Sequence, residues 1–202
     1  SRRQTRGFMM DIKAKAALMS IASNTLLIIL KTVVGIMTGS VSIISEAIHS
    51  GLDLLAAVIA FFSVRVSSLP PDERHRYGHG KVENVSGTIE ALLIFVAAIW
   101  IIVEAWGKLV NKTPVEMVSY GIVVMLFSSL ANLLISNYLY RVAKSTHSIA
   151  LEADALHLRT DVYTSAGVLV GLGVIYLTGW QVVDPLVAIG VAILIIKASI
   201  GL

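Results

Sequence analysis

The chain alternates long apolar runs with short polar segments, and six of the runs are long enough to cross a membrane as helices. A spanning helix needs roughly 20 mostly apolar residues. The six predicted helices cover residues 12–37, 41–67, 82–109, 115–143, 148–178 and 182–202. Only helices and closed barrels satisfy every backbone polar group in lipid, and these runs are far longer than barrel strands. The pattern therefore predicts an all-α membrane protein, a bundle of six transmembrane helices.

Lysine and arginine are distributed unevenly among the connections, which predicts the orientation. The N-terminal arm and the segments 68–81 and 141–147 each carry several, whereas the turns 38–40 and 178–181 carry none. Lys108 and Lys112, at the third connection, are a mild exception. Because cytoplasmic loops carry an excess of basic residues, we expect both termini in the cytoplasm.

Composition supports this class and excludes others. Hydrophobic residues make up 56% of the 202 residues and charged residues 14%, whereas soluble domains carry about 25% charged residues. The net charge of +3 does not indicate nucleic-acid binding, because the basic residues flank apolar segments. The chain has no cysteine, which excludes thiolate metal sites and disulfides.

One short pattern occurs twice, in the second and fifth predicted helices. Residues 46–53 and 154–161 both read acid-Ala-aliphatic-His-x-x-x-Asp, with His49 and Asp53 in the first copy and His157 and Asp161 in the second. A spacing of four residues puts His and Asp on one face of a helix. Counted at 1.5 Å per residue, each pair lies roughly 12 to 20 Å from its helix start. In antiparallel helices, both pairs fall near the middle of a slab about 30 Å thick.

The paired residues predict one shared metal site. A single intramembrane histidine is readily explained by a hydrogen bond across the bundle, but four costly polar residues at one depth need a common explanation. Two imidazoles and two carboxylates in a tetrahedron suit zinc; cadmium and cobalt(II) also fit. Magnesium and calcium prefer shells of oxygen ligands, and copper(I) prefers sulfur.

The same residue types predict exchange of metal for protons. Metal binds neutral imidazole and ionised carboxylate, and histidine ordinarily titrates at a pKa of about 6.5. A site that holds either metal or protons, and that opens alternately to each side, is an antiporter. We expect cytoplasmic metal to leave as protons enter.

Several other residues have expected roles outside the ligand set. Glu46 and Asp154 precede the two histidines by three residues, so we expect them to orient the imidazoles or to line a pore. Gly167 and Gly171 have the spacing of close helix packing. Packing, interface or pore-mouth roles are expected for Lys31, Glu90, Glu104, Asn132, Asn137 and Asp184.

The connection between the second and third predicted helices holds a second candidate metal site. Asp72, His75 and His79 lie within eight residues of one another. These three ligands would leave an open position for water, as accessible sites often do. The alternative is an ordinary solvated cytoplasmic loop.

These motifs resemble the cation diffusion facilitator family across all six predicted helices. The resemblance rests on the segments 39–42, 77–83, 46–53 and 154–161. It implies a homodimeric antiporter of divalent metal and protons, in the inner membrane of a prokaryotic cell, with zinc as the exported ion. It further implies that His49, Asp53, His157 and Asp161 form the transport site, and that Asp72, His75 and His79 form the loop site. Family members usually continue into a soluble cytoplasmic metal-binding domain, which is absent from these 202 residues.

Three other functions compete with zinc export. An intramembrane metalloenzyme would carry a His-Glu-x-x-His helix, which the sequence lacks, so no enzymatic activity is expected. A membrane sensor or scaffold that binds metal without moving it stays open. An iron or manganese exporter also stays open, although such members of the family tend to replace the first histidine.

Overall fold

A computed structural model describes the backbone of residues 2–67 and 81–199, and side chains at 12–56, 58–59, 85, 88–89 and 91–197. All regular secondary structure in these residues is helical, as predicted. The six helices are α1 (Arg2–Thr38), α2 (Val41–Ser67), α3 (Lys81–Asn111), α4 (Val118–Thr146), α5 (Ile149–Thr178) and α6 (Val183–Ser199).

Two predicted helices differ from the structure by several residues at their ends. Helix α1 begins at Arg2 instead of residue 12, because its basic N-terminal arm continues the helix. Helix α4 spans Val118–Thr146 instead of 115–143. Its start is delayed because the backbone N–H groups of Val115 and Glu116 bond to Gln181 Oε1 and Thr38 O, at 2.9 Å each, instead of opening the helix.

Four helical segments in the described part of the chain are long and apolar enough to cross a membrane. They are Ile12–Thr38, Ala91–Asn111, Val118–Thr146 and Ile149–Thr178. The shortest helix, α6, has 17 described residues, at the lower end of the range for a spanning helix.

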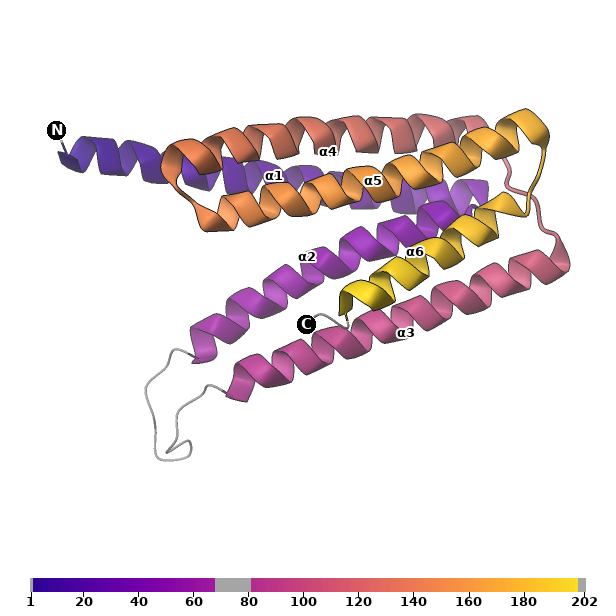
Figure 1. The fold of residues 1–202 in the computed structure, drawn as a ribbon, viewed down its shortest axis with the longest axis horizontal. Coiled ribbons are helices and arrows are strands. Elements are labelled where there is room, and N and C mark those ends of the chain that lie inside the picture. The colour runs from indigo at the N-terminus through magenta and orange to yellow at the C-terminus, as the bar shows by residue number, and fades with distance from the viewer. Residues whose placement is uncertain (1, 68–80, 200–202) are drawn as a thin grey trace.

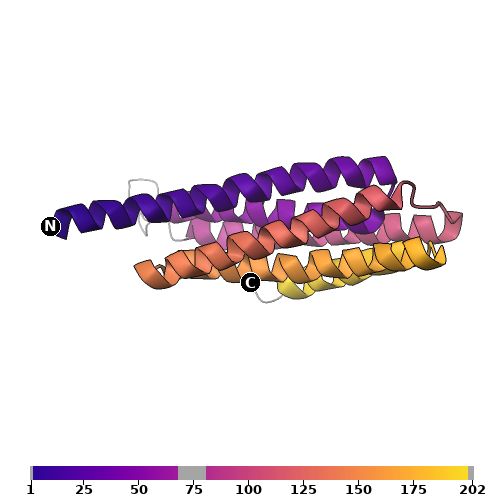
Figure 2. The ribbon, with the colours of Figure 1, turned by 90° about the horizontal axis from the view of Figure 1, so that it is seen from above.

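The helices form two groups that meet at one end (Figure 1). Helices α4 and α5 pack together with α1 against α4, and α2 packs with α3 and α6, while α1 also packs against α2. The groups converge at the end that holds the residues 38–41, 112–117 and 179–182, which we call the turn end, and they diverge toward the opposite, N-terminal end. Figure 2 shows that α1 projects beyond the other helices at this N-terminal end.

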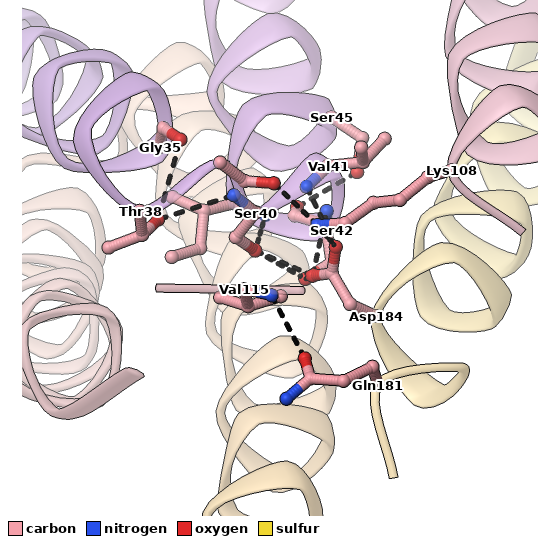
Figure 3. Close-up of polar contacts among 12 residues, drawn as sticks. Gly35, Thr38, Ser40, Val41, Ser42, Ser45, Lys108, Val115, Gln181 and Asp184 are labelled. Atoms are coloured by element: carbon pink, nitrogen blue, oxygen red, sulfur yellow. Dashed lines mark hydrogen bonds and ion pairs between the residues drawn. The ribbon is translucent and has the colours of Figure 1, made fainter. Parts of the chain in front are cut away.

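A buried carboxylate fixes the start of α2 at the turn end (Figure 3). Asp184, 1% exposed, accepts hydrogen bonds from the backbone N–H groups of Val41 and Ser42 and from the hydroxyl groups of Ser40 and Ser42. A carboxylate there satisfies free N–H groups and complements the helix dipole. Lys108 of α3 pairs with Asp184 Oδ2 at 2.8 Å. Asp184 and Lys108 thus join the ends of α2, α3 and α6.

Close helix packing was predicted at Gly167 and Gly171, and the structure shows it at Gly171. A Cβ added at Gly171 would lie 2.8 Å from Val187 Cγ2 on α6, so α5 and α6 approach each other closely there. At Gly167, by contrast, no described atom lies within 4 Å of the added Cβ. Only Gly171 therefore serves close packing.

Candidate metal site

The two copies of the repeated pattern face each other across α2 and α5. Ligand atoms of His49 and Asp53 on α2 and of Asp161 on α5 all lie within 4.8 Å of one another. This is close enough for one ion to contact all three. The antiparallel directions of α2 and α5 bring residues more than 100 positions apart in the sequence to one level.

His157 joins the group through Asp53. Its Nε2 lies 3.4 Å from Asp53 Oδ2, and His49 Nδ1 lies 3.4 Å from the same oxygen. His157 is outside the group of three whose ligand atoms are all mutually close. The four predicted ligands therefore form one cluster around Asp53, with His157 at its edge.

Asp161 is the cluster's most buried carboxylate and has no hydrogen-bond partner among the described residues. Its relative exposure is 0%, and neither carboxylate oxygen accepts a hydrogen bond from a described residue. A buried polar group without a partner is costly, so natural proteins almost always satisfy such groups. Two unpartnered carboxylate oxygens beside His49 and Asp53 fit a site for a cation.

A cavity of about 830 Å³ reaches the cluster from one side. His49, Asp53 and His157 of the cluster line it, together with Thr160 and Thr164 of α5. The other lining residues include Ala17, Ser20 and Asn24 of α1, Ala153 and Asp154 of α5, and Leu194 and Ile195 of α6. The α1 and α5 residues precede the site in helices that begin at the N-terminal end, and the α6 residues lie near that helix's last turn. The cavity thus lies between the cluster and the N-terminal end.

The two acids of the repeat have different surroundings. Asp154 lines the cavity, as one of its two predicted roles requires. Glu46 is 0% exposed and is absent from the described lining of the cavity. Its carboxylate forms an ion pair with Lys31 and accepts hydrogen bonds from Thr164 and Ser165. Neither predicted role describes Glu46.

Lys31 is the residue that sequence reasoning underestimated. It is 1% exposed and pairs with Glu46, whereas the sequence predicted a role in packing, at an interface or at a pore mouth. The signal was available, because Lys31 is the only charged residue between Ala16 and Met37. A lone charge in an apolar run needs a buried partner, but the sequence does not identify that partner.

The second candidate site lies outside the described residues. Asp72, His75 and His79 fall within residues 68–80. The loop site therefore stays a prediction.

Comparison with known proteins finds one family along nearly the whole chain. A family model described as the cation efflux transmembrane domain matches residues 17–202. An uncharacterised transporter of Synechocystis is 40% identical over 154 residues, which cover 76% of this chain and 50% of that protein. The cation-efflux pump FieF of Klebsiella pneumoniae is 31% identical over 187 residues, or 93% of this chain and 62% of the pump. FieF of Yersinia pestis is 31% identical over 185 residues, 92% of this chain and 61% of the pump.

The matches differ in how much of each protein they include. The chain is matched almost completely by the FieF proteins, yet it spans only about half to three-fifths of the length of these relatives.

Proposed function

The chain belongs to the cation efflux family, and from this premise we propose that it exports a divalent metal ion, with zinc as its main substrate. It is a multi-pass membrane protein of a prokaryotic membrane, given its four long apolar helices and its bacterial relatives. The ion would bind between α2 and α5, to His49, Asp53, His157 and Asp161. The observation that carries the proposal is the cluster of His49, Asp53 and Asp161, with ligand atoms within 4.8 Å of one another.

The choice of zinc rests on the chemistry of the ligands. Two imidazole nitrogens and two carboxylate oxygens match the tetrahedral shell that zinc accepts. Cadmium and cobalt(II) are the alternative substrates, since they accept the same donors. Calcium would need more oxygen ligands than the cluster offers.

In this proposal the N-terminal end faces the cytoplasm and all six helices cross the membrane. The basic residues of the arm and of the 141–147 connection favour this orientation. The cavity from the N-terminal end would then admit cytoplasmic metal to the site. The conformation described would be the one open to the cytoplasm, and export would need a second conformation open at the turn end.

Protons are the proposed counter-substrate. Imidazole ordinarily exchanges a proton near neutral pH, and binding of metal to histidine and carboxylate ligands releases protons. We expect zinc flux to rise with a pH gradient that drives protons the opposite way, and to fall when an ionophore removes the gradient. Zinc flux in proteoliposomes that ignores the gradient would exclude coupling.

Three further features belong to the proposal. Asp72, His75 and His79 would bind a second ion, the chain would act as a homodimer, and residues 1–202 would form the transmembrane domain. The relatives' greater length leaves room for a cytoplasmic domain in the longer proteins.

The test of the function is zinc uptake into vesicles by this chain and by its Asp161→Ala variant. Loss of one ligand from a closed site should remove most of the flux, because the ion then has an incomplete shell. Thr32→Val is a matched control, since Thr32 is exposed on α1 and bonds only to Ile28 O of its own helix. Equal flux in the parent and in Asp161→Ala would refute the assigned site. Zinc binding without flux in the parent would favour the scaffold.

A further inference from the structure

Two oppositely charged residues form a buried pair beside the candidate site. Lys31 of α1 and Glu46 of α2 are 1% and 0% exposed, and Lys31 Nζ forms an ion pair with Glu46 Oε2. Lys31 Nζ also donates to Ser50 Oγ at 3.4 Å and to Ser165 Oγ at 3.5 Å. The lysine on α1 therefore contacts both α2 and α5.

Glu46 of α2 also bonds directly to α5. Its Oε1 accepts hydrogen bonds from Ser165 Oγ and, at 3.2 Å, from Thr164 Oγ1. Thr164 and Ser165 lie on α5, one turn beyond the ligand Asp161, and Thr164 Oγ1 also bonds to Asp161 O at 3.1 Å. These contacts join α1, α2 and α5 immediately beside the ligands.

The pair lies on the side of the site opposite the cavity. Glu46 precedes His49 in a helix that begins at the turn end, and Ser165 follows Asp161 in a helix that ends there. Thr164, which donates to Glu46, lines the cavity, whereas Lys31, Glu46 and Ser165 are absent from its described lining. An ion that left the site for the turn end would have to pass these side chains.

We propose that the Lys31–Glu46 ion pair holds α2 against α5 and closes the route from the metal site to the turn end. The pair must then separate from its α5 partners each time an ion leaves by that route. The inference rests on the proposed function, because it assigns Lys31 and Glu46 as positioning residues for the same transport site.

The chemistry of the pair suits this role better than a purely structural one. Buried ion pairs contribute little stability over apolar residues of similar size, because removal of both charges from water is costly. The ammonium group of Lys31 also neutralises the Glu46 carboxylate, so the closed side offers no free negative charge to a divalent cation. When α2 and α5 separate, water can reach both charges and lower the cost of parting them.

The sequence has no cysteine, so one introduced thiol can report access to the site from each side of the membrane. Thr160→Cys adds one thiol at the cavity lining. A membrane-impermeant maleimide is applied to right-side-out and to inverted membrane vesicles. With Lys31 and Glu46 in place, labelling should be fast from the face of the N-terminal end and slow from the face of the turn end.

Loss of either charge should open the second route. Lys31→Met, added to Thr160→Cys, should raise labelling from the turn end by about tenfold, which corresponds to ~1.4 kcal/mol. Glu46→Gln should do the same, and it keeps an acceptor for Ser165 and Thr164, so the protein should still fold if Lys31→Met does not. Lys31→Arg and the charge reversal Lys31→Glu/Glu46→Lys should restore slow labelling, and Thr32→Val should change nothing.

Unchanged labelling from the turn end in both Lys31→Met and Glu46→Gln would overturn the inference. If labelling from the turn end stays fast in both the charge reversal and Lys31→Arg, the charges of the pair do not close the route. Zinc flux by the parent is measured in the same vesicles. A parent without flux refutes the proposed function, whereas the labelling rates test the closed route whether or not zinc moves.

Discussion

At the scale of single residues, the buried charges differ in whether they have partners. Lys31 and Glu46 pair with each other, and Asp184 pairs with Lys108 and caps α2. Asp161 is as buried as these residues, but its two oxygens accept no hydrogen bond from a described residue. Buried charges require compensation. We therefore expect a bound cation to stabilise Asp161 more than the carboxylates that already have partners.

Asp161→Asn tests this difference without transport. The variant should unfold no earlier than the parent in metal-free detergent solution, because it removes an uncompensated buried carboxylate. Zinc bound between α2 and α5 should stabilise the parent, by about 2.7 kcal/mol at a free concentration 100 times the Kd of this site, and zinc should stabilise the variant less. Thermal unfolding with and without zinc measures both effects. Equal stabilisation of the two proteins would mean that zinc binds elsewhere.

At the scale of helices, the sequence predicted the number and kind of elements but not all their details. The long apolar runs fixed six helices, and Asp184 was recognised as a polar residue outside the proposed ligand set. The start of α4 was predicted three residues early, because the bonds of Val115 and Glu116 to distant partners are invisible in local sequence. The glycine spacing could not distinguish Gly171 from Gly167, because only the position of α6 decides which one has a neighbour.

The two glycines supply a matched pair of substitutions on α5. Alanine favours a helix over glycine by about 1 kcal/mol, so Gly167→Ala should be neutral or stabilising. Gly171→Ala places a methyl group 2.8 Å from Val187 Cγ2, and such overpacking costs about 1–3 kcal/mol. Val187 is β-branched and has little rotamer freedom with which to yield.

Thermal unfolding of the two glycine variants in the same detergent measures the difference. Gly171→Ala should have the lower midpoint, below that of the parent. Equal midpoints would show that α6 moves away from α5 at little cost.

At the scale of the whole molecule, the arrangement of the two groups of helices determines access to the site. The groups meet at the turn end, where Asp184 and Lys108 join three helices, and they separate toward the N-terminal end (Figure 1). The cavity lies in this divergent half. Periodicity and basic residues predicted antiparallel pairs at one depth, but the open side and the contacts of Lys31 depend on how the helices are rotated and tilted.

The most direct test of the central claim is anomalous diffraction at the zinc edge from crystals grown with zinc. We predict a peak between α2 and α5, about 2.0–2.2 Å from ligand atoms of His49, Asp53, His157 and Asp161, that is lost in crystals of Asp161→Asn. An anomalous map with no peak between α2 and α5 at saturating zinc, or with the same peak in Asp161→Asn, would contradict the account.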